Sequence, residues 1–293
     1  MFSTPEKRWR QGAERWAKPA RALFQPARYA VDVISTDQAR RFITTHHYSR
    51  TMPAVRLCVG LFLDAGVHGA QLVGAAAFSV PAQAAVVPRY TGLGQAEGVE
   101  LGRFVCLDEE VPYNGESWFL SRALDLVQRH KSVRSIVSYS DPMERRDAGG
   151  LLTKGAHVGQ IYQATNALHC GRTSPRWVWL TRAGQVVSER ALSKIRAGDV
   201  GRDYAAAQLV AAGADPRRPG ECPRAWLSRV LQAPTFRRVR HPGQIVYVIP
   251  LDKAAKAAAL SANPDPAPYP KLSQLRQAPV WYQPSLFTPE RSL

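Results

Sequence analysis

The chain has 293 residues, of which 45% are hydrophobic, so it can bury a substantial core and is too large for a peptide-like binding module. Its formal net charge of +16 favours polyanionic partners, of which nucleic acid is the commonest. No apolar run approaches the roughly 20 residues of a membrane span and no secretory signal is recognisable, so we expect a cytoplasmic protein.

The basic residues are concentrated in two segments. Residues 1–28 hold seven Lys or Arg against two Glu, and residues 176–240 hold thirteen against five acids. The four cysteines form no CxxC pair, which argues against a zinc ribbon or a disulfide framework. Composition then suggests five regions: a basic arm (1–28), a catalytic core (29–180), a basic helical insertion (181–235), closing strands of the core (236–262) and a Pro-rich tail (263–293) that we expect to be extended or disordered.

The core begins with a helix and a hairpin. Asp37 is a suitable cap for a helix that starts at Gln38. Apolar runs at Arg56–Asp64 and Gln71–Val80 flank the turn Gly66–Gly69, which predicts two antiparallel strands.

Strands and helices alternate through the middle of the chain. Apolar spacing changes from strand-like to helical and back, which predicts an α/β layer architecture. The expected elements are a strand at Val99–Leu107, a helix at Glu116–His130, a strand at Ser135–Tyr139, a helix at Gly159–Leu168 stopped by Gly171, and a strand at Arg176–Leu180.

The remaining elements are shorter. Three helices are expected at Ser188–Arg196, Arg202–Ala212 and Pro223–Leu231, because Gly and Pro separate these stretches. The segment Phe236–Leu251 predicts a strand pair that turns at Pro242-Gly243 and closes an edge of the core sheet.

The loop before the helix Glu116–His130 is the first candidate site. Asn114 and Gly115 allow close approach to a helix N-terminus, whose free N–H groups suit a pyrophosphate. The alternative is an ordinary strand-to-helix crossover, and the negative charge of Glu116 would compete with a phosphate.

The second candidate is the polar run Ser138–Pro142, at the carboxyl end of a strand, where ligands bind in open sheets. Asp141 could accept a proton or orient an amine there. An Asp before Pro also commonly starts a turn, so a structural role stays open.

The third candidate, His46–Arg50, places two imidazoles, a phenol and a hydroxyl within five residues. These groups donate, accept or ligate near neutral pH. Adjacent loop residues point in different directions, and the segment could equally be a cationic helix C-terminus.

The fourth candidate is Tyr162, near the start of the predicted helix Gly159–Leu168. A phenol at this position could act as a general acid. It could also be a core residue whose hydroxyl is satisfied.

Together these segments resemble the Mom family of bacteriophage proteins, which modify adenine. The resemblance is strong over Thr45–Leu180 and weaker over the closing run RRVRHPGQIVYVIPL. It rests on the order and spacing of HHYSR, ELGRFVCLDEEVPYNGESWFLSRAL, SYSDP and GQIYQATNALHCG.

The resemblance implies a GNAT-like α/β (α+β) fold, with a mixed central sheet flanked by helices and an added helical lobe. It implies acetyl-CoA or another acyl or aminoacyl donor as the cofactor. Phe104, Val105 and Cys106 would pair with its pantetheine-like part, and Asn114, Gly115, Glu116 and Ser117 would face its phosphates. The usual acetyltransferase loop Gln/Arg-x-x-Gly-x-Gly/Ala is absent before the helix Glu116–His130.

The reaction implied by the resemblance converts adenine in phage DNA to N6-carbamoylmethyladenine, which protects the DNA from restriction in the cytoplasm of the bacterial host. Adenine N6 is a poor nucleophile, so double-stranded DNA would present the base flipped out. His47 and Tyr48 would contact the base or shuttle a proton, Asp141 would accept the N6 proton or hold the amine, and Tyr162 would protonate the leaving group. Acetyl transfer alone would give an amide instead, so a further activation or another donor is needed. No ligand set with metal spacing is visible, which leaves the metal unknown.

DNA phosphates would be contacted mainly from the second basic segment. Two other functions remain open: a GNAT-type acetyltransferase for RNA, protein or a small molecule, and a non-catalytic nucleic-acid-binding protein. The residues expected to bind DNA are Arg50, Lys194, Arg196, Arg202, Arg237, Arg238 and Arg240.

Overall fold

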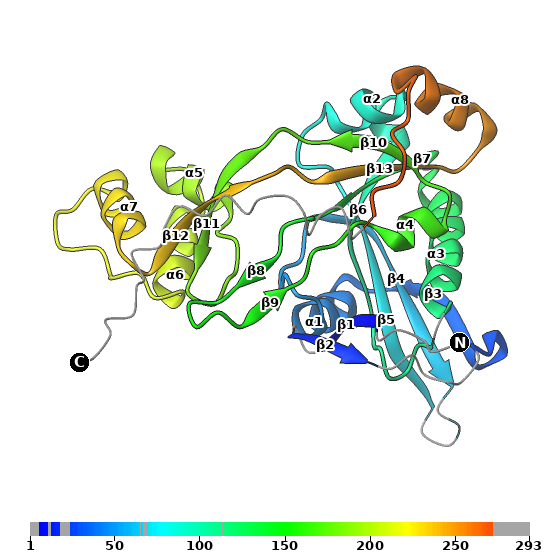
Figure 1. Ribbon diagram of the computed structural model, residues 1–293, viewed down its shortest axis with the longest axis horizontal. Coiled ribbons are helices and arrows are strands. Elements are labelled where there is room, and N and C mark those ends of the chain that lie inside the picture. The colour runs from blue at the N-terminus through cyan, green and yellow to red at the C-terminus, as the bar shows by residue number, and fades with distance from the viewer. Residues whose placement is uncertain are drawn as a thin grey trace. The chain divides into compact units, whose positions relative to one another are not determined.

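A computed structural model describes residues 6–10, 13–17, 24–64, 66, 69–112 and 114–271 of the chain (Figure 1). Contacts divide these residues into two compact units. Unit 1 contains the residues up to Pro142, His157–Thr173 and the segment from Gln244 onward, and unit 2 contains Met143–Ala156 and Ser174–Gly243. Among the described residues no helix is both long and apolar enough to cross a membrane.

Unit 1 is built on a seven-stranded mixed sheet in the order β10-β13-β7-β6-β5-β4-β3. Neighbouring strands are antiparallel except for β6 and β7, which run parallel. The predicted hairpin is confirmed as β4 and β5. The strands are β3 (Tyr29–Ile34), β4 (Val55–Asp64), β5 (Ala70–Ser79), β6 (Gly98–Cys106), β7 (Ser135–Ser140), β10 (Leu168–Arg172) and β13 (Ile245–Pro250).

Helices cover both faces of this sheet. Side chains of α1 pack with Ala75, Ala77 and Val105, whereas Phe119 of α3 packs on Phe104 and beside Gly74. Because successive strand residues face opposite sides, α1 and α3 lie on opposite faces (Figure 1). The helices of unit 1 are α1 (Thr36–His46), α2 (Val86–Thr91), α3 (Gly115–Lys131), α4 (Gln160–Ala164) and α8 (Lys253–Ala262), with 3-10 turns at Pro26–Arg28 and Gln95–Glu97.

The first helix starts differently from the expectation. Ser35, and not Asp37, is its cap: the Gln38 backbone N–H donates to Ser35 Oγ at 3.2 Å, and the Ser35 backbone N–H donates to Gln38 Oε1 at 3.1 Å. This reciprocal capping box satisfies two donors that the helix leaves open, so it defines the start more strongly than one acidic residue does.

The helix predicted at Gly159–Leu168 is shorter than expected. α4 ends at Ala164, because Asn166 adopts a left-handed backbone with φ of 55°. Leu168–Arg172 is therefore not helical and forms the edge strand β10, so Gly171 lies within a strand and does not stop a helix.

The two expected closing strands do not form a pair. β13 enters the central sheet between β10 and β7, whereas β12 (Phe236–His241) pairs with β11 (Arg176–Thr181) in unit 2. Arg176–Leu180 is consequently a strand, as predicted, but not one of the core sheet. The apolar alternation shows that each segment is a strand and contains no information about its distant partner.

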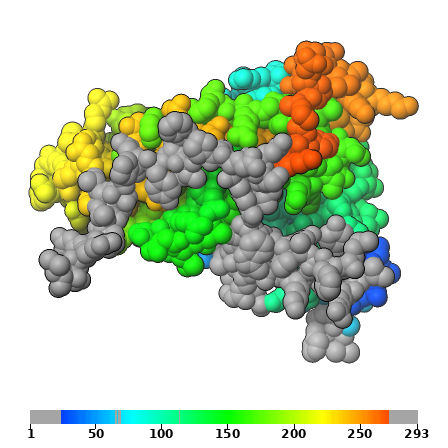
Figure 2. Space-filling view, in the orientation of Figure 1, coloured from blue at the N-terminus to red at the C-terminus, as the bar shows by residue number. Residues whose placement is uncertain are grey.

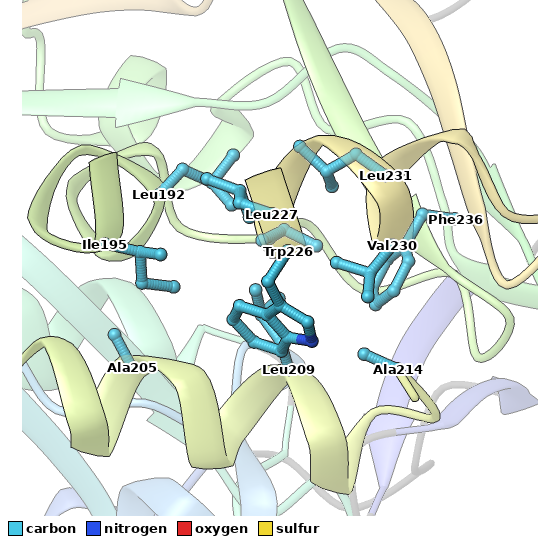
Figure 3. Packing of buried hydrophobic residues seen from close by; sticks show 11 residues of the cluster. Leu192, Ile195, Ala205, Leu209, Ala214, Trp226, Leu227, Val230, Leu231 and Phe236 are labelled. Atoms are coloured by element: carbon cyan, nitrogen blue, oxygen red, sulfur yellow. The ribbon is translucent and has the colours of Figure 1, made fainter. Parts of the chain in front are cut away.

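Unit 2 has its own apolar core. The three predicted helices are confirmed as α5 (Glu189–Ala197), α6 (Arg202–Ala211) and α7 (Pro223–Gln232). Trp226 is 1% exposed and lies among side chains from all three helices (Figure 3). Its indole Nε1–H donates to the Asp215 carbonyl at 2.8 Å, so its one polar group is satisfied. The short strands β8 (Arg145–Arg146) and β9 (Leu152–Lys154) pair with each other.

Part of the Pro-rich tail is ordered along unit 1. Residues 263–271, orange to red in Figure 2, follow α8, and hydrogen bonds place them along β10: the Ala267 N–H donates to the His169 carbonyl at 3.0 Å, and the Tyr269 hydroxyl donates to the Ala167 carbonyl at 2.8 Å. The rest of the predicted tail, 272–293, lies outside the described residues. Within the predicted arm, residues 1–5, 11–12 and 18–23 also lie outside them, whereas β1 (Glu6–Arg10) and β2 (Ala13–Ala17) pair as antiparallel strands.

Candidate active site

The parallel strands β6 and β7 pair only over a short distance. Their register runs from Gly98 opposite Ser135 to Glu100 opposite Val137, and β6 continues beyond that point without β7. The Leu107 N–H donates to Val73 of β5. Since backbone groups alternate along a strand, those of Phe104 and Cys106 are directed to the opposite edge, where β7 has parted from β6.

A β-bulge in β6 places two charged residues on one face. Leu101 lies opposite Phe78 and Arg103 opposite Ala77, so Gly102 has no partner on β5. Glu100 lies opposite Ser79, and Ser79 and Ala77 are two residues apart on one face. The bulge therefore brings Glu100 and Arg103 to the same face. A glycine is needed here, because a Cβ on residue 102 would lie 2.5 Å from the Ser79 hydroxyl.

Arg103 and Glu100 perturb each other electrostatically. Arg103 is anchored by Thr51, since its Nε donates to the Thr51 carbonyl at 2.9 Å and its Nη2 to Thr51 Oγ1 at 2.7 Å. Burial raises the pKa of Glu100, against the opposing charge of Arg103. Burial also lowers the pKa of Arg103, whereas the electrostatic influence of Tyr48 and Glu100 raises it. We did not predict either residue, although two charges within the otherwise apolar run VELGRFVCL could have identified them.

Tyr162 is buried at the start of α4. Burial raises the pKa of its phenol to about 12, with smaller contributions in the same direction from Tyr48 and Glu100. The hydroxyl of Ser138 lowers that pKa in part: it is close to the phenol but does not reach hydrogen-bond geometry. The predicted general-acid candidate is thus a protonated phenol at neutral pH, and it lies near both Glu100 and Tyr48.

Close packing holds the Tyr162 ring in place. Its centroid lies 5.3 Å from that of Tyr247, whose hydroxyl donates to the Val158 carbonyl. Gly159 has φ of 77°, and a Cβ there would lie 2.5 Å from the Tyr247 ring and 2.9 Å from the Tyr162 ring. Only glycine satisfies both the left-handed backbone and this approach.

Strand β7 adds further polar groups. Burial raises the pKa of Tyr139, and Glu100 and Tyr90 shift it in the same direction, against the charge of Arg89. Ser138 and Ser140 are buried on the other face, and the Oγ of each lacks a hydrogen-bond partner in the structure. Buried unsatisfied hydroxyls are costly, and such groups are often kept for function.

The segment after α1 forms a tight turn, in which the Arg50 N–H donates to the His47 carbonyl at 3.0 Å. The Ser49 N–H donates to His47 Nδ1 at 3.1 Å, so the proton of the neutral imidazole is on Nε2. The His47 and Tyr48 rings lie against each other, with centroids 4.2 Å apart. The side chains of these two predicted residues therefore form one packed aromatic pair. Arg50 is exposed at the end of the turn.

Asp141 directly follows β7 and is 7% exposed. Its carbonyl accepts from the His157 N–H at 3.0 Å, and the His157 ring meets the Tyr162 ring edge-on at 6.2 Å. The predicted carboxylate thus lies next to the segment that carries Tyr162.

The start of α3 was predicted to face phosphates. Asn114 is its N-cap residue, in a left-handed backbone with φ of 72°, and the Ser117 hydroxyl donates to the Asn114 carbonyl at 3.1 Å. Gly115 is buried: Phe24 and Val111 come within 3.0 Å of where its Cβ would be. Glu116 lies in the first turn. Gly115 is therefore required by the chain's own packing, and the phosphate contacts expected of Asn114–Ser117 stay a prediction.

The predicted DNA-binding residues differ in their surroundings. Arg196 pairs with Glu189 at 2.9 Å, and Arg202 with Asp203 at 3.6 Å, so their charges are partly compensated. Lys194 is half-buried. Arg237 donates to the Arg146 carbonyl at 3.3 Å, whereas Arg238 and Arg240 are exposed.

Across the described residues no three His, Cys, Asp or Glu side chains gather as metal ligands.

Two solved structures are among those similar to this chain. A tandem GNAT protein from the clavulanic acid biosynthesis pathway is 10% identical, with a TM-score of 0.41 over 76% of this chain and 99% of its own. Malonyl-CoA decarboxylase from Rhodopseudomonas palustris is 13% identical, with a TM-score of 0.31 over 81% of this chain and 60% of its own. No curated protein matches the chain. The model of the Mom protein family matches residues 28–271, most of the chain, and the chain therefore belongs to this family.

Proposed function

We propose that this protein transfers a carbamoylmethyl group to N6 of adenine in phage DNA, and thereby protects that DNA from restriction in the bacterial host. Membership of the Mom family supports a DNA-modifying transferase. The observation that carries the proposal is the group of Glu100, Arg103, Tyr48 and Tyr162, brought together where β6 and β7 part.

The acceptor is an exocyclic amine with little basicity. Its lone pair is delocalised into the adenine ring, so N6 must lose a proton as the new bond to carbon forms. A base paired in a duplex is inaccessible, and enzymes with such targets flip the base out and stack it on aromatic side chains. The paired rings of His47 and Tyr48 supply such a surface beside Arg103.

Glu100 is the proton acceptor in this proposal. A carboxylate whose pKa is raised by burial is a stronger base than one in water, and the opposing charge of Arg103 favours its ionised form. Asp141, at the end of β7, is the alternative acceptor that the sequence predicts, and in our proposal it holds the amine.

Tyr162 donates the proton that the leaving group requires. Its raised pKa keeps the phenol protonated at neutral pH, so it can hydrogen-bond to negative charge that develops on the departing atom. Packing against Tyr247 and Gly159 fixes the ring, so little reorganisation accompanies the reaction.

The donor is an acyl-type or aminoacyl-type compound whose chain lies along β6. The backbone groups of Phe104 and Cys106, which are directed toward the parting of the strands, are suited to pair with the amides of a pantetheine-like chain. When bound, the donor would supply a carbamoylmethyl group whose methylene carries the leaving group, so that the N6–CH2 bond forms as the bond from that methylene to the leaving group breaks. Acetyl-CoA alone cannot give this product, because acetyl transfer places a carbonyl carbon on N6 and the product has a methylene carbon there.

The test is to express the protein in bacteria, digest their DNA to nucleosides and search by mass spectrometry for modified deoxyadenosine. We expect a species heavier by one carbamoylmethyl group. We expect Glu100→Gln to lower its yield by about 10²-fold or more, because a general base contributes 10²- to 10⁴-fold. Asp125→Asn, a carboxylate-to-amide change on the exposed side of α3, is the matched control and should retain the yield.

The outcomes separate the alternatives. If Asp141→Asn abolishes the adduct while Glu100→Gln does not, Asp141 is the proton acceptor. A purely acetylated nucleoside would favour the acetyltransferase function. Unmodified DNA in cells that contain folded wild-type protein would contradict the proposal.

A further inference from the structure

Aromatic and basic side chains alternate across one face of the β11–β12 sheet in unit 2. Trp177 lies directly opposite Arg240, and Trp179 opposite Arg238. Residues directly opposite each other share a face, and so do residues two apart along a strand. We call these four residues the Trp–Arg ladder.

The rings and guanidiniums of the ladder are in contact. The Arg238 guanidinium carbon lies 4.7 Å from the Trp177 ring centroid and 6.0 Å from that of Trp179, and the Arg240 carbon lies 5.6 Å from the Trp177 centroid. Two cations thus share Trp177. Cation–π contact within about 6 Å is attractive, so it offsets the repulsion between the two arginines and limits their movement.

One end of the ladder is buried and the other is open. Trp179 packs against the apolar core of unit 2, next to the buried Phe236, whereas 42% of Trp177 is exposed. The buried end anchors the sheet on the three-helix core. A large exposed aromatic side chain, held by a rigid sheet, is typical of a binding surface.

The charge around the ladder is positive. Strands β11 (RWVWLT) and β12 (FRRVRH) contain four arginines and no acid. Three acids of unit 2 are paired with arginines, since Glu189 pairs with Arg196, Glu221 with Arg229 and Glu144 with Arg146. A polyanion near unit 2 is therefore drawn toward the ladder.

The spacing of the ladder suits a nucleic acid strand. Arg238 and Arg240 are two residues apart, which is about 7 Å along a strand. Guanidiniums form bidentate bonds to phosphates, and the tryptophan ring already orients them, so less conformational entropy is lost on binding. Exposed aromatic rings stack on unpaired bases of any sequence.

We propose that the Trp–Arg ladder is the surface on which this protein docks its DNA: Arg238 and Arg240 bind successive phosphates, and Trp177 stacks on a base that has left the duplex stack. This inference rests on the proposed function in that DNA is the partner. It adds the surface and a preference for locally opened DNA, such as the strand from which an adenine is flipped.

The first experiment measures binding of the full-length protein to a labelled duplex by fluorescence anisotropy at several salt concentrations. Each phosphate contact contributes about 0.9 to the slope of log affinity against log salt. We expect Arg238→Ala/Arg240→Ala to reduce that slope by about 1.8. Arg190→Ala/Arg224→Ala removes the same charge from exposed positions on α5 and α7 and should leave the slope unchanged. An equal loss in both double variants would overturn the ladder as the docking surface.

The second experiment tests Trp177 with two duplexes, one fully paired and one with a single unpaired base. Stacking on one base accounts for about 5- to 150-fold in affinity. We expect Trp177→Ala to weaken binding to the opened duplex by that factor and to the paired duplex much less, and Trp177→Phe to retain most of the binding. Equal binding by Trp177→Ala and wild type, or a loss confined to RNA of the same sequence, would contradict the proposal. Circular dichroism of each variant establishes that it is folded.

Failure of this inference is distinguishable from failure of the proposed function. Loss of DNA binding in the ladder variants, when the wild type leaves no adduct in cells, supports the ladder and contradicts the transferase. An adduct formed equally well by wild type and ladder variants, with unchanged binding, contradicts the ladder alone.

Discussion

The two units of this protein use charge in opposite ways. In unit 1, Glu100 and Arg103 are partly withdrawn from water. Burial raises the pKa of Glu100 and lowers that of Arg103, and each shift favours the neutral form of the side chain. In unit 2, Arg238 and Arg240 remain exposed and lie over an aromatic ring. A desolvated charge is chemically reactive and costly, whereas a hydrated charge attracts a partner at little cost in stability. The comparison agrees with our two proposals, which give the chemistry to unit 1 and DNA binding to unit 2.

The units also differ in what stabilises them. Unit 1 is organised by long-range strand pairing and tolerates buried hydroxyls without partners, such as those of Ser138 and Ser140. Unit 2 has three short helices around one tryptophan. We expect polar changes in unit 1 to alter rate more than stability, and apolar changes in unit 2 to do the reverse.

The largest expected effect is that of Tyr162→Phe. Loss of a general acid should lower the amount of modified adenine by 10²- to 10⁴-fold, as is usual for such groups. Because the phenol lacks a well-formed partner in Ser138, we expect the free energy of unfolding to change by less than about 1 kcal/mol. Mass spectrometry of digested DNA and urea unfolding measure the two quantities. A large loss of stability with normal modification would contradict our expectation that polar changes in unit 1 alter the rate more than the stability.

Trp226→Ala should have the next largest effect. The side chain is fully buried among three helices, and such truncations cost about 3–5 kcal/mol. We expect faster hydrogen exchange in α5, α6 and α7, with protection of the central sheet of unit 1 retained. Tyr204→Ala, at a side chain that is 71% exposed, is the control and should leave exchange unchanged. Loss of protection throughout both units would show that they do not unfold separately.

Ser35→Ala tests the start of α1. Removal of a serine cap costs about 1 kcal/mol, whereas an acidic side chain in the first turn contributes about 0.3–1 kcal/mol. Urea unfolding should therefore show a larger loss for Ser35→Ala than for Asp37→Ala. The opposite order would restore Asp37 as the cap that the sequence alone suggests.

The smallest expected effect is a pH dependence of unit 1. Hydrogen bonds from Arg134 and from the Ala255 N–H lower the pKa of Asp252 to about 2. A carboxylate with a lowered folded-state pKa contributes stability that is present above its unfolded pKa, near 3.8, and is lost as the pH falls toward 2. We expect the urea midpoint to fall as the pH is lowered from about 5 to 3, and to fall less in Asp252→Asn. An identical pH profile for the wild type and Asp252→Asn would show that ionised Asp252 does not stabilise the fold.

Local patterns were enough to predict much of this protein. Helical spacing identified α3 and the three helices of unit 2, because a helix face depends on residues three and four apart. The strand pattern predicted the β4–β5 hairpin because the face of a strand also depends on near neighbours, namely residues two apart. Motif order also indicated Tyr48 and Tyr162, of which Tyr48 interacts electrostatically with Arg103 and Tyr162 with Glu100, while their roles stay predictions.

Other features depend on contacts between residues that are distant in the chain. The bulge at Gly102, which brings Glu100 and Arg103 to one face, is visible only in the register with β5. The pairing of β11 with β12 joins strands separated by three helices, and it creates the Trp–Arg ladder. The sequence by itself determined where the charge is concentrated and where most helices and strands lie, because these depend on near neighbours, but it did not predict β3, β10 or α8. Only the tertiary structure decided which strands meet, because strand pairing is set by distant partners whose side chains must share a face.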